Sequence, residues 1–227
     1  MPPKKSASSK PYDFSRLTKS SDEICAMVFR RMANPLSKLL ILHTSITPNQ
    51  VSVFSFFVAL AGAVFFAMGG YANMIWGGLL FFVYVILDHV DGSIARIKNM
   101  GSKKGQWFDG IIGFVSIPMA IFSLAYGIGS LYAMTLCALA IIAYPMQYLI
   151  MHFYKLDIVG INAPMGISKS GKLDFFKKFY GSMMFFMLLF VAIIINKPIW
   201  LLLFFATVGN LVWMFTIFLQ YRNLGDR

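Results

Sequence analysis

The chain has 227 residues, of which 58% are hydrophobic and only 13% are charged. A soluble domain averages about 25% charged residues, so this composition excludes an ordinary soluble protein and predicts one polytopic membrane domain. The formal net charge of +11 would suggest nucleic acid as a partner for a soluble chain. Here the basic residues lie in short loops between apolar segments, so we expect membrane lipids with anionic headgroups as the counter-charge, and no nucleic acid.

The first 44 residues divide into two predicted segments. Residues 1–20 are rich in Ser and Lys, which predicts a disordered cytoplasmic tail. Residues 21–44 carry apolar side chains at helical spacing and charged side chains on other faces. We predict an amphipathic interfacial helix that begins at Ser21 and bends before Pro35, with a short soluble helix as the alternative. The apolar positions are Ile24, Val28, Met32, Leu36, Leu39 and Leu40.

Residues 45–227 are predicted to form one domain of six transmembrane helices, which makes the fold class all-α. A turn and helix-start sequence at 45–50 is followed by apolar runs of about 20 residues, the length that crosses a hydrocarbon core of about 30 Å. The predicted spans are 50–69, 72–90, 107–127, 130–153, 179–196 and 198–220. Pro118 and Pro145 fall inside two of these spans and are expected to bend them.

The distribution of Lys and Arg predicts the orientation of the domain. Nineteen of the 20 basic residues fall in the N-terminal region, the loops after the second and fourth spans, or the C-terminus, and only Lys197 falls on the opposite side. Basic residues accumulate on the cytoplasmic side of a membrane protein. Both termini and the loop after the second span are therefore expected to be cytoplasmic.

Three of the nine acidic residues, Asp88, Asp91 and Asp109, lie at the ends of apolar segments, where carboxylates are least expected. Each unpaired Asp costs about 2.5–3.5 kcal/mol in hydrocarbon on insertion scales. Three together need a compensating cation. Intramembrane carboxylates also mark ion pathways, so an ion-coupled transporter is the alternative, but the sequence shows no inverted internal repeat.

The residues around these carboxylates indicate what the cation does. If the stretch is helical, Asp88, Asp91 and Ala95 share a face. Gly92 and Ala95 add little bulk, which lets a ligand approach the backbone, and the planar guanidinium of Arg96 suits a diphosphate. Carboxylate oxygens suit Mg²⁺ or Mn²⁺, and a pair of such ions is a common device for phosphoryl transfer.

The stretch Asp-x2-Asp-Gly-x2-Ala-Arg-x8-Gly-x3-Asp resembles the signature of the membrane-embedded CDP-alcohol phosphatidyltransferases. Its seven specified positions are Asp88, Asp91, Gly92, Ala95, Arg96, Gly105 and Asp109. The family pattern ends on a fourth Asp, which this chain replaces with Gly113. A Thr-Pro-Asn sequence such as Thr47-Pro48-Asn49 typically begins the first spanning helix of the family, near the nucleotide pocket.

The resemblance implies a phosphotransferase of phospholipid synthesis that moves a phosphatidyl or substituted phosphoryl group from a CDP-alcohol to an acceptor alcohol, with release of CMP. CDP-diacylglycerol is the expected donor, and a homodimer is the expected assembly. Asp88, Asp91 and Asp109 would be the catalytic residues and the ligands of two Mg²⁺ or Mn²⁺ ions. The implied substrate-binding residues are Asn49, Asp88, Gly92, Ala95, Arg96 and Gly105.

Gly113 leaves alternatives open, because the fourth Asp of the family is usually assigned as a second-metal ligand and as the general base. The chain is either a transferase with a substitute base or a metal-activated hydroxyl, or a relative that binds CDP-lipid or metal without turnover. His89 is expected to face away from the ligand side, and His152 and Asp157 are minor candidates for the base. The basic connection 154–178 either folds over the site or is an ordinary solvated loop.

Overall fold

The computed structural model describes residues 12–17, 24–160 and 182–224, and every regular element within these ranges is helical. The prediction of an all-α membrane protein is thereby confirmed. The elements are η1 (Phe14–Leu17), α1 (Ile24–His43), α2 (Pro48–Met68), α3 (Tyr71–Ile97), α4 (Lys103–Ile128), α5 (Leu131–Phe153), η2 (Tyr154–Ile158), α7 (Ser182–Ile194), α8 (Pro198–Phe204), η3 (Phe205–Gly209) and α9 (Asn210–Leu224).

A helix, α1, is present where the interfacial helix is predicted; its place in the membrane interface stays a prediction, and its predicted start at Ser21 lies outside the described residues. Pro35 lies inside the helix without ending it. Of the apolar positions that predicted the helix, Val28, Met32 and Leu39 are exposed. A neighbouring stripe of side chains is buried instead, so α1 keeps apolar side chains on its outer face, as a helix in the membrane interface requires. The buried stripe is Cys25, Phe29, Ala33, Ser37 and Ile41.

Five helical stretches within the described residues are long and apolar enough to cross a membrane. They begin at Pro48, Tyr71, Lys103, Leu131 and Pro198, where the sequence predicts the first four spans and the last. The predicted span 179–196 corresponds to α7, of which 13 residues are described. The count of six spans therefore stays a prediction. Pro118 and Pro145 lie within α4 and α5 without ending them.

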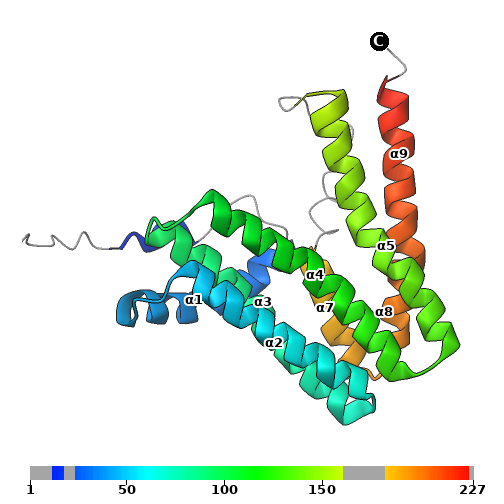
Figure 1. Ribbon diagram of the computed structural model, residues 1–227, viewed down its shortest axis with the longest axis horizontal. Coiled ribbons are helices and arrows are strands. Elements are labelled where there is room, and N and C mark those ends of the chain that lie inside the picture. Colours follow the sequence, from blue (N-terminus) through cyan, green and yellow to red (C-terminus); the bar gives the residue numbers. More distant parts are fainter. Residues whose placement is uncertain (1–11, 18–23, 161–181, 225–227) are drawn as a thin grey trace, which may run out of the picture.

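Helix α2 packs at close range against both α3 and α4, and the picture shows the three helices running side by side (Figure 1). A Cβ atom at Gly62 would lie 2.9 Å from the ring of Phe81 on α3, and one at Gly127 would collide with the carbonyl oxygen of Phe66 on α2. The Phe66 and Phe81 rings stack with centroids 5.3 Å apart. Small residues that admit close backbone approach are the usual contact between helices in membranes.

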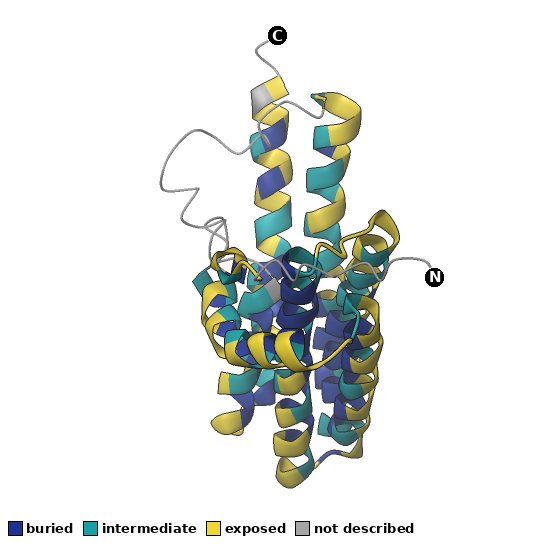
Figure 2. Ribbon diagram, turned by 90° about the vertical axis from the view of Figure 1, so that its left-hand side faces the viewer, coloured by how far each residue is buried: buried dark blue, intermediate teal, exposed yellow. Residues whose placement is uncertain are grey.

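Helices α5 and α9 form a pair that extends beyond the other described helices at one end (Figures 1 and 2). Polar side chains join the two helices: Gln147 Nε2 donates to Thr216 Oγ1 over 3.3 Å, and Asn210 Nδ2 donates to the carbonyl of Leu139 over 3.0 Å. Figure 2 shows few buried residues along this pair and many in the body below it.

Candidate active site

The acidic motif spans the end of α3 and the start of α4, and only Lys98–Ser102 lies between them. Both helices extend further into the motif than the predicted spans 72–90 and 107–127. Asn99 adopts φ 53°, in the left-handed region that Asn tolerates, and Met100 N donates to the carbonyl of Ala95 over 2.9 Å. The Ser102 hydroxyl then caps α4 by accepting from Gly105 N over 3.0 Å. A tight turn thus brings the two halves of the motif face to face.

Helix α2 begins beside this turn. Its start is fixed by a capping box between Thr47 and Gln50, with Pro48 in the first turn. The side chain of Lys98, at the end of α3, donates to the carbonyl of Thr44 over 2.8 Å. This bond ties the link between α1 and α2 to α3. The first turns of α2 and α4 therefore lie beside the last turn of α3.

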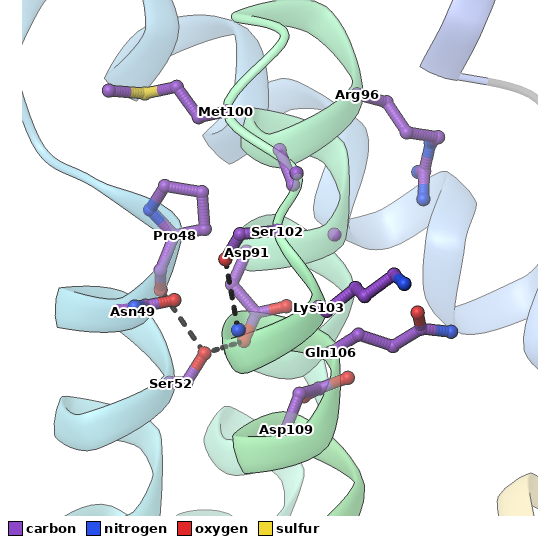
Figure 3. A pocket seen from close by; sticks show the side chains of 14 residues that line it. Pro48, Asn49, Ser52, Asp91, Arg96, Met100, Ser102, Lys103, Gln106 and Asp109 are labelled. Atoms are coloured by element: carbon purple, nitrogen blue, oxygen red, sulfur yellow. Dashed lines mark hydrogen bonds between the residues drawn. The ribbon is translucent and has the colours of Figure 1, made fainter.

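A cavity of about 490 Å³ opens between these three helix ends (Figure 3). Six of the seven motif positions line it, and so does Asn49 of α2. The exception is Asp88. The lining residues are Pro48, Asn49, Ser52, Asp91, Gly92, Ala95, Arg96, Met100, Gly101, Ser102, Lys103, Gly105, Gln106 and Asp109.

The two motif glycines that line the cavity allow its walls to approach each other. A Cβ atom at Gly105 would lie 2.9 Å from Asn49 Oδ1 and 3.1 Å from Ser102 Oγ. A Cβ atom at Gly92 would lie 3.2 Å from Nη1 of Arg96. A larger residue at either position would displace these polar side chains from the places they hold at the cavity.

Asp91 is the more buried of the two carboxylates that line the cavity, with 4% of its surface exposed. Its Oδ2 accepts a hydrogen bond from the Ser52 hydroxyl over 2.6 Å, which links α3 to α2. Asp109 faces the same cavity from α4. The three carboxylates repel one another electrostatically, and Arg30 of α1 attracts that of Asp88. The site thus concentrates negative charge from two helices at one end of the bundle.

The carboxylate oxygens of the cavity are suitable ligands for a divalent cation, but they are too few to surround the ion without other ligands. Among the described residues, no three His, Cys, Asp or Glu side chains are close enough to hold a metal ion. Mg²⁺ is ordinarily held through one or two carboxylates, with substrate phosphates and water completing its shell. Asp91 and Asp109 fit that mode because both line the space a substrate would enter, so their role as ligands, with Asp88 as a third, stays a prediction.

The other sequence candidates lie away from the cavity wall. His89 is buried, with Nδ1 3.0 Å from the Val85 carbonyl and its ring 6.2 Å from that of Phe29, which places it in packing between α3 and α1. His152 lies near the end of α5 and Asp157 in η2, and neither lines the cavity. In the connection 154–178, residues 161–178 lie outside the described residues.

Gly113 lies on α4 one turn after Asp109 and is not part of the cavity lining. A Cβ atom built there meets nothing within 4 Å among the described residues. The backbone therefore has room for a side chain, and glycine at this position is not explained by close packing.

Sequence reasoning missed several residues of the wall, of which Ser52, Ser102, Lys103 and Gln106 carry polar side chains. Ser52 follows Asn49 by three positions on α2, and Lys103 and Gln106 lie in the first turn of α4. Helical spacing from the motif residues was the available signal, since positions three or four apart share a face.

The fold and the site together define a class of protein: a helical membrane protein with a polar cavity, containing carboxylates, where three helix ends meet. The family model for CDP-alcohol phosphatidyltransferases matches residues 45–218, so the chain belongs to that family. This match covers the cavity and every predicted site residue, and it confirms the resemblance carried by the motif.

Curated relatives match a shorter stretch. The archaetidylinositol phosphate synthase of Pyrococcus horikoshii is 29% identical over 43% of this chain and 51% of its own length. The phosphatidylinositol phosphate synthase of Mycobacteroides abscessus is 28% identical over 36% of each chain. A bifunctional IPC transferase and DIPP synthase of Rubrobacter xylanophilus is 34% identical over 40% of this chain and 20% of its own length. The chain thus spans about half or less of the length of these relatives.

Proposed function

We propose that the chain is a transferase that moves a phosphatidyl group from CDP-diacylglycerol to an acceptor alcohol. An acceptor oxygen forms the new bond to phosphorus while the bond from phosphorus to the CMP oxygen breaks, and the acceptor proton is released. The observation that carries this proposal is one cavity that gathers Asp91, Asp109 and Arg96 beside the first turns of two helices.

The helix ends supply the binding site for the diphosphate. Helices α2 and α4 both present their N-terminal turns to the cavity, through Pro48 and Asn49 on one side and Lys103 to Gln106 on the other. Unpaired backbone N–H groups and the helix dipole favour anions at such ends. The side chains of Arg96 and Lys103 add positive charge from the same wall. Together they orient the donor with its phosphates toward the carboxylates.

The carboxylates hold the cation that this family generally uses. We assign this role to Asp91 and Asp109 in the cavity, with Asp88 beside them, and Ser52 fixes the Asp91 carboxylate by donating to it. A divalent cation bound there, Mg²⁺ or Mn²⁺, in a pair as the family resemblance implies, would neutralise charge on the diphosphate and on the departing CMP. These side chains add no covalent chemistry and act by position.

The acceptor we propose is a phosphorylated polyol. Two of the relatives are named as inositol phosphate lipid synthases. A polyol phosphate is an anion, which suits a cytoplasmic end where 19 of the 20 basic residues are expected. We assign both termini and the cavity to the cytoplasmic side and the assembled form to a homodimer.

Gly113 favours a second candidate function, a relative that binds CDP-lipid without turnover. A general base typically contributes about 10²–10⁴-fold in rate, and position 113 carries no side chain to act as one. We propose slow turnover in preference, because the rest of the motif lines one cavity.

The test is CMP release by the purified protein with Mn²⁺, CDP-diacylglycerol and a panel of alcohols and alcohol phosphates, with Asp91→Asn as the inactive control. Release that requires both an acceptor and the wild-type carboxylate supports the transferase. CDP binding without CMP release from any acceptor supports the binding-only candidate. Proton- or sodium-coupled uptake into liposomes would instead support a transporter.

A further inference from the structure

The short helix η1 (Phe14–Leu17) is attached to the end of α3, although 70 or more residues separate them in sequence. Leu17 is 3% exposed and packs in an apolar cluster with Leu87, Val90 and Ile94 of α3. Lys38 of α1 lies 5.8 Å from the centroid of the Phe14 ring. Residues 12–17 thus form a strap across the polar end of the bundle.

Two arginines, Arg16 of the strap and Arg96 of α3, hold the strap in place because each donates a hydrogen bond to the backbone of the other. Arg16 Nη1 donates to the carbonyl of Arg96 over 3.3 Å and to Asn99 Oδ1 over 3.0 Å. In return, Arg96 Nε donates to the carbonyl of Arg16 over 3.3 Å. Both guanidinium groups are therefore held at the end of α3, where both arginines line one cavity, and a bound anion would be attracted by both positive charges.

A second cavity, of about 450 Å³, lies at this pair of arginines. Its lining is Arg16, Ala95, Arg96, Asn99 and Gly101, with no acidic residue among them. Ala95, Arg96 and Gly101 also line the cavity that holds Asp91 and Asp109, so the two cavities share a wall. The second cavity therefore adjoins the proposed donor site on its basic side.

The remaining donors of Arg16 suit an anion. A guanidinium carries five N–H groups, and the bonds above use those of Nη1 alone, which leaves Nε and Nη2 without a partner among residues 12–17, 24–160 and 182–224. The nearest carboxylate on the strap, Asp13, accepts from the Ser15 hydroxyl over 2.6 Å and from Ser15 N over 3.1 Å. These bonds lower the pKa of Asp13, and the charge of Arg16 lowers it by a smaller amount, while the Asp13 side chain is hydrogen-bonded within its own turn.

We propose that this cavity is an anion subsite that binds a phosphate group through the guanidinium groups of Arg16 and Arg96. Arg forks match the oxygens of phosphate geometrically, and charge-assisted hydrogen bonds of this kind are the strong ones. The phosphate has two chemical sources, the phosphorylated acceptor alcohol or the headgroup of an anionic lipid at the cytoplasmic surface. The first source rests on the proposed function and the second does not.

The experiment compares wild type with Arg16→Gln, which removes the charge, and Arg16→Lys, which keeps it. The matched control is Arg31→Gln, because Arg31 is an exposed arginine of α1 that lines neither cavity. The first measurement is the shift in melting temperature on adding inorganic phosphate to the full-length protein. We expect the shift in wild type and Arg31→Gln, a smaller one in Arg16→Lys and none in Arg16→Gln.

The second measurement separates the two sources. If the acceptor supplies the phosphate, Arg16→Gln raises KM for an alcohol phosphate by about 10-fold or more, the cost of one charge-assisted hydrogen bond, and leaves KM for the same alcohol without phosphate unchanged. If a lipid supplies it, Arg16→Gln removes the difference in CMP release between vesicles of neutral lipid and vesicles that contain anionic lipid, with every acceptor KM unchanged.

The outcomes distinguish this inference from the function above. A phosphate shift that is equal in Arg16→Gln, Arg31→Gln and wild type, or absent in all three, overturns the subsite. A shift that depends on Arg16 in a protein that releases no CMP supports the subsite while the proposed transferase fails. A lower melting temperature of Arg16→Gln without phosphate shows a structural role of the strap, and Arg16→Lys with a restored shift then still supports the subsite.

Discussion

Two parts of the bundle differ in how their helices meet. Helices α2, α3 and α4 meet through glycines and stacked phenylalanines, and their ends hold the acidic cavity. Helices α5 and α9 meet through the polar pair Gln147 and Thr216 and through Asn210, and they extend past the body (Figure 1). The tightest of these contacts, at Gly62, Phe66 and Gly127, lie toward the ends of α2 and α4 opposite to the cavity, so close packing at one end holds in place the three helices that carry the cavity at the other.

The largest effect is expected from Asp91→Asn, which keeps the shape of the side chain and removes its charge. Because the carboxylate is proposed to hold the cation, CMP release should fall more than about 100-fold, beyond the loss of about 10–100-fold typical of residues that only support a metal ligand. The measurement is kcat with saturating CDP-diacylglycerol. Asp157→Asn, a change in η2, is the matched control, and equal activity of the two variants would contradict the site.

Gly113→Asp should change activity in the opposite direction. The backbone there has room for the new side chain, and a general base contributes about 10²-fold or more, so kcat should rise by roughly 10²-fold. Gly113→Asn, of the same size without the base, should leave kcat low. A variant Gly113→Asp no faster than wild type would show that another group already takes the acceptor proton.

Alanine at two glycines of α4 tests close packing directly. Gly127→Ala places a methyl group against the Phe66 carbonyl, which cannot move without shifting α2, so it should destabilise the protein by about 1–3 kcal/mol. Gly113→Ala meets no neighbour among the described residues and should be neutral or stabilising by up to about 1 kcal/mol. The check is thermal unfolding in one detergent, and equal melting temperatures would refute the packing argument.

Ser52→Ala should have an intermediate effect on catalysis. The variant loses the 2.6 Å bond that orients Asp91, and loss of such an orienting partner costs about 10-fold in metal affinity or rate at the low end. The expected readout is a higher Mn²⁺ concentration at half-maximal CMP release. Ser55→Ala, one turn further along α2, removes a bond to a backbone carbonyl only and should leave the Mn²⁺ dependence unchanged.

The smallest effect is expected from a change in the polar side chains that join α5 to α9. Gln147→Leu removes a pair of hydrogen bonds with Thr216, and interhelical hydrogen bonds in membranes average only about 0.6 kcal/mol. Its melting temperature should therefore fall less than that of Gly127→Ala, with CMP release unchanged. A larger loss of stability than Gly127→Ala would reverse the ranking of the two regions.

Sequence alone predicted which residues gather at the cavity better than it predicted the bounds of the helices that carry them. The motif spacing placed Asp91, Arg96 and Asp109 at one site, and the structure brings them to one cavity. The hydropathy pattern placed the end of the second span at 90 and the start of the third at 107, because the polar residues of the site are typical of loops. The helices continue to Ile97 and from Lys103, since those polar residues face the cavity and not the lipid.

Asp88 shows where helical spacing is too coarse. Asp88 shares a face with Asp91 and Ala95 but lies about 4.5 Å further from the end of α3 than Asp91 does, and it is outside the cavity lining, in electrostatic contact with Arg30. Ser52 was missed for a different reason: a helical serine usually bonds to its own backbone, and this one also lies 3.1 Å from the Pro48 carbonyl. Contacts between helices far apart in sequence have no local signal.

The central claim is that the cavity at the ends of α2, α3 and α4 binds the diphosphate of a CDP-alcohol through cation-holding carboxylates. Titration of CDP into wild type and Asp91→Asn, with and without Mn²⁺, tests it most directly. The account predicts binding to wild type that requires Mn²⁺ and is lost in Asp91→Asn. Equal binding in both proteins, with no dependence on Mn²⁺, would contradict it.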